Sequence, residues 1–228
     1  MDNSDIIKNN IEKIRSNVLL FGFDIKIIAV TKTVSLENIE KAIECGIADI
    51  GENKVQEMLP KIEILKNKYK NLKFHFIGHL QTNKVNKIIG KVDLIQSVDS
   101  FKLAEKISNY AEKLNIIQDI LLELKTSDEE TKFGIKLENI FREYEAISKL
   151  KNIRIKGIMT MAPYFDNSEK SRPYFKKAKN IFDEIKKRYE NSDFGILSMG
   201  MTSDYLIALQ EGSNMIRIGT GIFGKRGL

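Results

Sequence analysis

The chain alternates short β-rich apolar runs with longer amphipathic segments from one end to the other, and this alternation restricts its possible folds. An opening helical segment near residues 3–20 is followed by eight strand-like runs: Ile25–Val30, Ala48–Ile50, Lys73–Ile77, Asp93–Ser97, Ile117–Glu123, Ile153–Met159, Gly195–Ser198 and Met215–Ile218. Between these runs, apolar residues recur about every 3.6 positions, which is the period of an amphipathic helix. Strands that alternate with helices form right-handed βαβ units, so the sequence predicts a parallel sheet.

Eight such units in 228 residues predict an α/β protein with a closed (β/α)8 TIM barrel rather than an open doubly wound sheet. No Pro/Gly-rich linker or change in composition divides the chain, so we expect a single domain over residues 1–228 with an extra N-terminal helix. A chain of this length can bury a large core without disulfides. Its single cysteine, Cys45, cannot form a disulfide within the chain and indicates a reducing compartment.

The net charge of +6 comes from 30 lysines and 7 arginines against 31 acidic residues. The lysines alternate with acids along segments such as KAKNIFDEIKKRYE, as on solvated helix faces. Since no concentrated basic stripe is present in the sequence, we expect no nucleic-acid partner. The N-terminus lacks the apolar core of a secretion signal, and no run approaches the roughly 18 apolar residues of a membrane span. We therefore expect a soluble cytoplasmic protein without a membrane partner.

The loops that follow the strands contain the residues with the clearest chemical signal, because active sites of (β/α)8 barrels are built from these loops. Ser198 and Gly200 lie at the end of the seventh predicted strand, and Gly219 and Thr220 follow the eighth. In such barrels these two loops form a recurrent phosphate site, where backbone N–H groups and small hydroxyls surround an anion. Glycine turns that only close the barrel are the alternative interpretation.

Two basic residues adjoin buried strands instead of helix surfaces. Lys32 follows the apolar run Ile27–Val30, where desolvation would leave its amine neutral enough to attack an aldehyde and form a Schiff base. Arg217 lies inside the apolar run MIRIG, where its charge needs a partner. A lysine that extends to solvent and an arginine paired with a structural carboxylate are the alternatives. Together with a phosphate site, Lys32 predicts a phosphorylated carbonyl ligand, which also allows a Schiff-base aldolase acting on a sugar phosphate.

Other chemistries find little support in the sequence. His75 lies between Phe74 and Phe76, so a hydrogen-bonded role in the core is favoured over catalysis. With two histidines and one cysteine in the chain, we expect no metal site. The sequence contains no G-x-S-x-G elbow, Walker loop or G-x-G-x-x-G opening, which disfavours hydrolases, NTPases and dinucleotide-binding enzymes.

Several motifs recur together over nearly the whole chain: AVTKTVS, GENKVQE, FHFIGHLQTNK, SVDS, TKFGI, GIMTMAP, LSMGMTSD and MIRIGTGIFG. In this order they resemble the YggS/PROSC family of pyridoxal 5′-phosphate (PLP) homeostasis proteins. The resemblance implies a barrel of the alanine racemase N-terminal type, which is PLP fold-type III. It also implies a PLP carrier of vitamin B6 homeostasis without known turnover, whose partners are the cofactor and PLP-dependent apoenzymes. Since we expect no second domain to complete a shared site, we expect a monomer.

The resemblance also implies roles for individual residues. Lys32 would hold PLP as an internal aldimine, and Arg217 would face the pyridine nitrogen. The cofactor phosphate would lie against Ser198, Gly200, Gly219 and Thr220, while Asn53, His75 and Met201 would line the ring. Because an arginine is always charged, it leaves the pyridine nitrogen unprotonated, which limits the carbanion chemistry open to the cofactor.

The sequence departs from the family pattern at two places. Many members have a lysine and a proline where this chain has Val34 and Ser35, so cofactor exchange through position 34 is excluded. Lys132 matches a lysine of the family's SKSG-like segment and could assist, whereas His79 stands where a proline is common. The alternative function is a racemase-type PLP enzyme that lacks the second domain, for which Tyr164 is a candidate acid or base.

Overall fold

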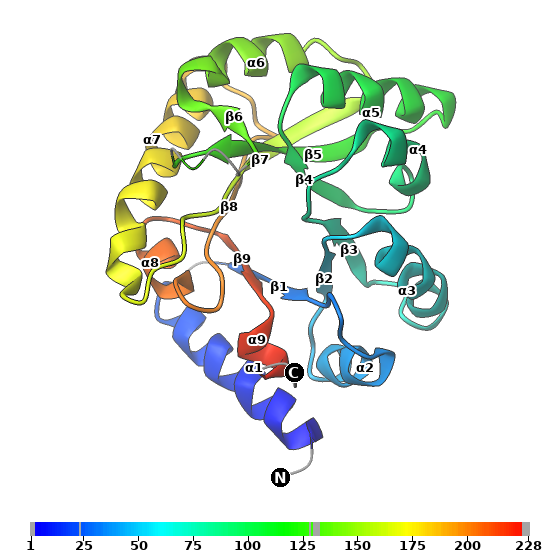
Figure 1. Cartoon of the computed structure of the whole chain (residues 1–228), viewed down its shortest axis with the longest axis vertical. Coiled ribbons are helices and arrows are strands. Elements are labelled where there is room, and N and C mark those ends of the chain that lie inside the picture. Colours follow the sequence, from blue (N-terminus) through cyan, green and yellow to red (C-terminus); the bar gives the residue numbers. More distant parts are fainter. Residues whose placement is uncertain (1–2, 23, 128, 130–132, 225–228) are drawn as a thin grey trace.

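The computed structural model describes residues 3–22, 24–127, 129 and 133–224 and contains a closed barrel of eight parallel strands. The ring order is β4-β3-β2-β1-β9-β8-β7-β5, and pairing of β4 with β5 closes it (Figure 1). The strands are β1 (Lys26–Val30), β2 (Asp49–Glu52), β3 (Lys73–Phe76), β4 (Leu94–Val98), β5 (Gln118–Lys125), β6 (Ile135–Lys136), β7 (Ile153–Thr160), β8 (Ile196–Ser198) and β9 (Met215–Ile218). The predicted barrel and its eight strands are confirmed. The sequence did not predict β6, which pairs with the end of β5.

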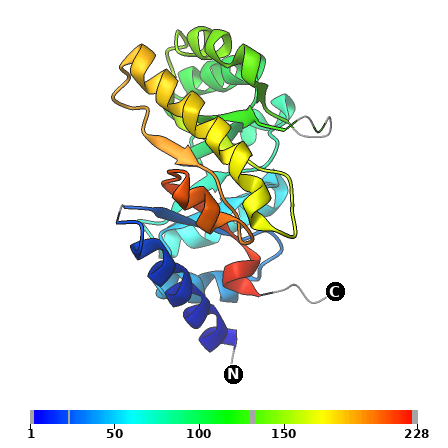
Figure 2. The same ribbon diagram turned by 90° about the vertical axis from the view of Figure 1, so that its left-hand side faces the viewer.

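Helices surround the ring of strands, as Figure 1 shows in a view through the barrel. They are α1 (Asn3–Leu19), α2 (Leu36–Glu44), α3 (Val55–Lys68), α4 (Val85–Ile88), α5 (Phe101–Lys113), α6 (Ile140–Ile147), α7 (Arg172–Tyr189), α8 (Tyr205–Gln210) and α9 (Thr220–Phe223). Three short 3-10 helices are η1 (Thr82–Lys84), η2 (Leu137–Asn139) and η3 (Ser168–Ser171). The extra N-terminal helix α1 is confirmed, and it packs against α2 and α9 at one end of the molecule (Figures 1 and 2).

Local sequence accounts for where several helices begin. The hydroxyl of Ser35 accepts a hydrogen bond from the backbone N–H of Asn38 at the start of α2, and Ser100 caps α5 through Leu103 in the same way. Such N-caps stabilise a helix by about 1 kcal/mol, because they satisfy an N–H group that has no partner within the helix. These helices begin directly after strand-following loops, so the caps also fix where those loops end.

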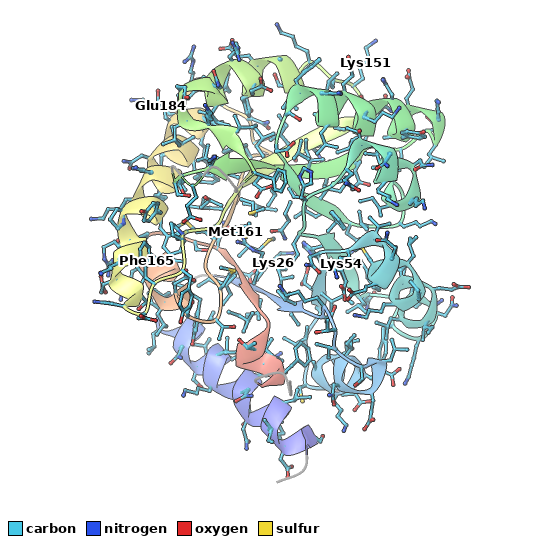
Figure 3. All side chains as sticks on the ribbon, in the orientation of Figure 1. Lys26, Lys54, Lys151, Met161, Phe165 and Glu184 are labelled. Atoms are coloured by element: carbon cyan, nitrogen blue, oxygen red, sulfur yellow. The ribbon has the colours of Figure 1, made fainter. Side chains whose placement is uncertain are left out.

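The barrel interior contains its own apolar cluster. Ile28, Leu94, Leu121 and Met159 pack there with Met215, one from each of five strands. Met161 is partly buried against this cluster and lies inside the ring of strands in Figure 3. The interior is therefore packed, and any ligand site lies at an end of the barrel.

A bulge in β7 brings β8 close to it. The register with β5 shifts between Ile120 and Leu121, so β7 contains one extra residue at this point. At Gly157, φ is +153°, and a Cβ atom would lie 1.8 Å from the carbonyl oxygen of Ile196. Only glycine fits here without displacing β8, whose end leads into the predicted phosphate loop.

Within the described ranges, no helix has the length and apolar character needed to cross a membrane.

Candidate functional site

A cavity of about 550 Å³ opens where β1, β8 and β9 end. It lies at the end of the barrel where sites are expected, because its lining comes from strand C-termini and the loops after them. Five residues selected from the sequence line it together: Lys32, Met201, Arg217, Gly219 and Thr220. Val30, Thr202 and Ser203 line it as well but were not selected, and Tyr164, which was considered only as an acid or base, lies at its edge.

Lys32 lies in a strained turn directly after β1. The N–H of Val34 donates to the carbonyl oxygen of Thr31 at 3.0 Å, and between them Thr33 has φ of +60°. A β-branched residue in this left-handed region costs of order 1–3 kcal/mol, and such strain clusters at functional sites. The N–H of Thr33 donates to Glu57 Oε2 at 3.2 Å, so α3 helps to hold the turn. The half-buried side chain of Lys32 therefore starts from a fixed backbone position.

A buried ion pair supports the residue before Lys32. Glu52 and Lys61 lie 2.5 Å apart, with side chains 1% and 12% exposed. Thr31 donates its hydroxyl hydrogen to Glu52 Oε1 at 2.6 Å and accepts from Lys61 Nζ at 2.7 Å through its carbonyl oxygen. These contacts tie the end of β1 to β2 and α3. The sequence analysis missed them, although a glutamate at the end of a buried strand was a possible signal.

Arg217 is 3% exposed and points its guanidinium at neutral groups. Nη1 donates to Ser198 Oγ at 2.6 Å, and Nη2 donates to the carbonyl oxygen of Thr160 at 2.9 Å. Within the described ranges, no carboxylate lies at ion-pair distance from it. Burial lowers the pKa of Arg217 to about 10, against the opposing charges of Asp204 and Glu123. Arg217 is therefore protonated at neutral pH, with N–H groups left over for a ligand.

A chain of hydrogen bonds leads from Arg217 across the barrel interior. Ser198 Oγ donates to Gln96 Oε1 at 2.7 Å, and Gln96 Nε2 lies 3.0 Å from His75 Nδ1. His75 Nε2 lies 2.9 Å from Asp49 Oδ1. This series of hydrogen bonds thus joins strands β9, β8, β4, β3 and β2 beneath the cavity. His75 and Ser198, both selected from the sequence, lie in this chain and not in the cavity lining.

The charge on Asp49 determines which atoms donate and which accept along this series of hydrogen bonds. Burial alone would raise the pKa of Asp49, but the hydrogen bond from His75 and nearby lysine charges hold it below its ordinary value. A carboxylate accepts a hydrogen from His75 Nε2, which leaves Nδ1 to accept one from the amide of Gln96. The Gln96 oxygen then accepts from Ser198, whose own oxygen accepts from Arg217. This order of donors and acceptors fixes the guanidinium at the floor of the cavity.

The other selected residues, Asn53 and Gly200, do not line this cavity. Asn53 lines a separate cavity of about 240 Å³, and its buried Oδ1 has no partner within the described part of the chain. Gly200 has φ of +95°, and a Cβ there would lie 2.6 Å from Ala208 Cβ, so it allows α8 to pack closely against the loop. His79 stacks on Phe133 with ring centroids 3.6 Å apart. Lys132 lies outside the described residues.

Glu123 near Arg217 predicts a measurable pH dependence. It is 4% exposed, and burial, followed by the charge of Asp99, raises its pKa from the usual 4.5 to about 7, although Arg217 opposes the increase. The folded chain therefore holds this proton more tightly than the unfolded chain. Its stabilising effect is complete below the unfolded pKa and is lost as the pH rises through about 7.

Glu123→Gln keeps the neutral form at every pH. We expect the variant and the wild type to unfold at similar urea concentrations at pH 4, and the variant to be more stable by roughly 3 kcal/mol at pH 8. Urea titrations at both pH values measure this difference. An equal difference in unfolding free energy between variant and wild type at both pH values would contradict the raised pKa of Glu123.

Comparison with known proteins identifies the family. The family model of the alanine racemase N-terminal domain matches residues 3–227. The pyridoxal phosphate homeostasis protein of Aquifex aeolicus (strain VF5) is 45% identical over 201 residues, which cover 88% of this chain and 87% of that protein. The chain belongs to the pyridoxal phosphate homeostasis protein family. The pyridoxal phosphate homeostasis protein of Synechocystis is 39% identical, over 89% of this chain and 92% of the relative.

Solved structures agree with the family assignment. PipY of Synechococcus elongatus PCC7942 without PLP superposes with a TM-score of 0.88 at 31% identity, covering 96% of this chain and 100% of PipY. The structure of PipY with PLP bound has a TM-score of 0.86 at 30% identity over the same shares. Alanine racemase of Clostridium difficile 630, at 18% identity and a TM-score of 0.78, shares the fold over 100% of this chain and 61% of the racemase. The homeostasis protein family thus has the racemase-type barrel that the sequence motifs predict.

Proposed function

We propose that this chain binds pyridoxal phosphate in the cavity of about 550 Å³ and serves its homeostasis as a carrier. The observation that carries the proposal is the convergence of one lysine, one buried arginine and two hydroxyl- and glycine-rich loops on a single cavity. The family relatives named for this function support it. Bound PLP supplies an aldehyde to which an amine can attach covalently, and Lys32 is the lysine of the described residues that lines the cavity.

The loops after β8 and β9 fit the phosphate of such a ligand. The backbone N–H groups of Thr202 and Ser203 lie in a turn and have no hydrogen-bond partner in the part of the chain that the structure describes. Thr202 Oγ1 accepts the N–H of Gly221 at 3.1 Å, which joins the two loops. Asp204 accepts the N–H of Met201 at 2.6 Å and so fixes the start of the turn. Free N–H groups and hydroxyls on a fixed turn are suited to bind an anion.

Arg217 would hold the ring end of the ligand. Its guanidinium is fixed from below by Ser198 and Thr160, so its remaining N–H groups can donate to an aromatic nitrogen without a change of position. With a pKa of about 10, it keeps its own proton at neutral pH. A ring nitrogen that accepts a hydrogen bond stays unprotonated, which makes the ring a weak electron sink and favours storage over amino-acid chemistry.

The absorption spectrum tests the proposal. Purified protein loaded with PLP should absorb visible light, and borohydride reduction followed by peptide mapping should find the pyridoxyl group on Lys32. A colourless protein that does not retain added PLP would overturn it. The proposed recipients are PLP-dependent apoenzymes, and transfer to one of them would be measured as recovered enzyme activity.

Racemase-type catalysis is the competing function. It requires an acid or base held at the cofactor, and Tyr164 is the candidate at the cavity edge. Tyr164 is 78% exposed, and no described hydrogen bond holds its phenol in the fixed geometry that proton transfer needs. The loaded protein should therefore leave a panel of L-amino acids unchanged. Sustained inversion of any of them would overturn the carrier function.

A further inference from the structure

A second cavity of about 310 Å³ lies between the end of β5, the segment from β6 to η2 and helix α7. Three of the described lysines line it, namely Lys125, Lys136 and Lys177, with Thr126 and Ser127. It shares no lining residue with the cavity around Lys32. Its volume is near the lower end of the roughly 300–1,000 Å³ of small-molecule sites.

Two of the lysines form a like-charged pair. Lys125 of β5 and Lys136 of β6 are register partners on parallel strands, so their side chains leave the same face of the sheet. Like charges directly opposite each other on neighbouring strands destabilise the pairing. Neither ammonium has an ion-pair or hydrogen-bond partner within the described residues. The pairing therefore favours an anion between them.

Lys177 adds a third positive charge from the opposite wall. It extends from α7, with its ammonium 5.8 Å from the ring centroid of Tyr174, and it lines the same cavity. Among the described lining residues Glu138 is the one carboxylate, and it is exposed on η2. The described lining therefore holds more ammonium groups than carboxylates.

A buried hydroxyl points to a bound acceptor. Ser127 is 7% exposed, and its Oγ has no hydrogen-bond partner within the described ranges. Leaving a buried hydroxyl without a partner costs about 1–3 kcal/mol. Its neighbour Thr126 is already satisfied, because its Oγ1 lies 3.1 Å from Thr160 Oγ1. Ser127, which also lines a smaller cavity beside Glu123 and Phe133, is therefore a lining group whose hydrogen bond is available to a ligand.

We propose that this cavity binds a phosphate dianion, either inorganic or part of a phosphorylated small molecule. The lining offers several ammonium donors and one free hydroxyl donor, which match the acceptor oxygens and double charge of a phosphate better than the single charge of a carboxylate. The site is separate from the proposed PLP cavity and does not depend on it.

Titration of the isotopically labelled full chain with inorganic phosphate tests the site. The backbone amide resonances of Ser127, Gly134 and Leu137 should shift saturably, whereas potassium chloride at equal ionic strength should leave them in place. In Lys136→Gln/Lys177→Gln the dissociation constant should increase at least about tenfold, because two charge-assisted hydrogen bonds are removed. The matched control Lys151→Gln/Lys176→Gln removes equal charge from exposed lysines outside the cavity and should bind as the wild type.

A second ligand separates the two sources of phosphate. Tighter binding of glycerol phosphate would assign the site to phosphorylated small molecules, and equal or weaker binding would assign it to inorganic phosphate. The site would be overturned if phosphate did not shift these amide resonances, or if potassium chloride shifted them equally. It would also be overturned if both double variants weakened phosphate binding to the same extent. Amides of Thr202 and Ser203 report the other cavity in the same spectra, so a failure of this site is distinguishable from a failure of the proposed PLP function.

Discussion

Lys32→Ala is expected to abolish covalent attachment of pyridoxal phosphate. Of the described lysines, Lys32 alone lines the cavity, so the variant removes the one amine that the described residues place there for attachment to the aldehyde. After incubation with PLP and removal of the excess, the variant should show no visible absorption. Borohydride reduction should add no pyridoxyl mass to it, whereas the wild type should gain one group per chain.

Lys54→Ala is the matched control. Lys54 follows β2 at the same end of the barrel, is exposed, is labelled in Figure 3 and lines a different cavity. This variant should keep the colour of the wild type. Visible absorption that survives in Lys32→Ala, or disappears in Lys54→Ala, would contradict the proposed attachment point.

The barrel should stay folded without the Lys32 side chain. Thr31 is held by Glu52 and Lys61, and Thr33 is held by Glu57, so the turn does not depend on the amine. Lys54 pairs with Glu57 at 3.4 Å, and its side chain is 64% exposed. Exposed ion pairs contribute roughly 0–1 kcal/mol, and other substitutions of exposed side chains usually change stability by less than about 0.5 kcal/mol. Urea unfolding of the two lysine variants should therefore coincide, which separates loss of attachment from loss of fold.

Lys32 and Arg217 could be found from the sequence because each is a charge beside or within an apolar run. Such a charge stands out without knowledge of its contacts. The strands could also be found from the sequence, because buried parallel strands are short apolar runs rich in β-formers. The strand β6 escaped prediction because two residues, Ile135 and Lys136, are too few to show any period.

The contacts of Ser198 could not be predicted in this way. Its partner Gln96 lies 102 positions away in the sequence and reaches it only because the closed barrel brings side chains of β4 and β8 together in its interior. A glutamine in the run LIQSV is compatible with many roles until its neighbours are known. Likewise, the loop conformation that exposes Thr202 and Ser203 to the cavity depends on Gly221 and Asp204, through contacts that no periodicity encodes.

Arg217→Met is expected to weaken retention of pyridoxal phosphate by about 10–100-fold. A hydrogen bond from a charged donor contributes about 1.5–3 kcal/mol, and each 1.4 kcal/mol corresponds to a tenfold change in affinity. Methionine is chosen because it fills most of the space of the arginine side chain and avoids a cavity at the floor of the site. Dialysis of the loaded protein, followed by the remaining absorption, measures retention.

The same substitution should leave the free energy of unfolding within about 1 kcal/mol of the wild type. The substitution removes a buried charge whose hydrogen-bond partners are neutral. Ser198 still donates to Gln96 in the variant. No described carboxylate at ion-pair distance therefore loses its partner. Lys84→Met, at a half-buried lysine by another cavity, is the control and should retain the cofactor as the wild type does. Equal retention in both variants would remove Arg217 from the site. A large loss of stability in Arg217→Met would instead assign the residue to the fold.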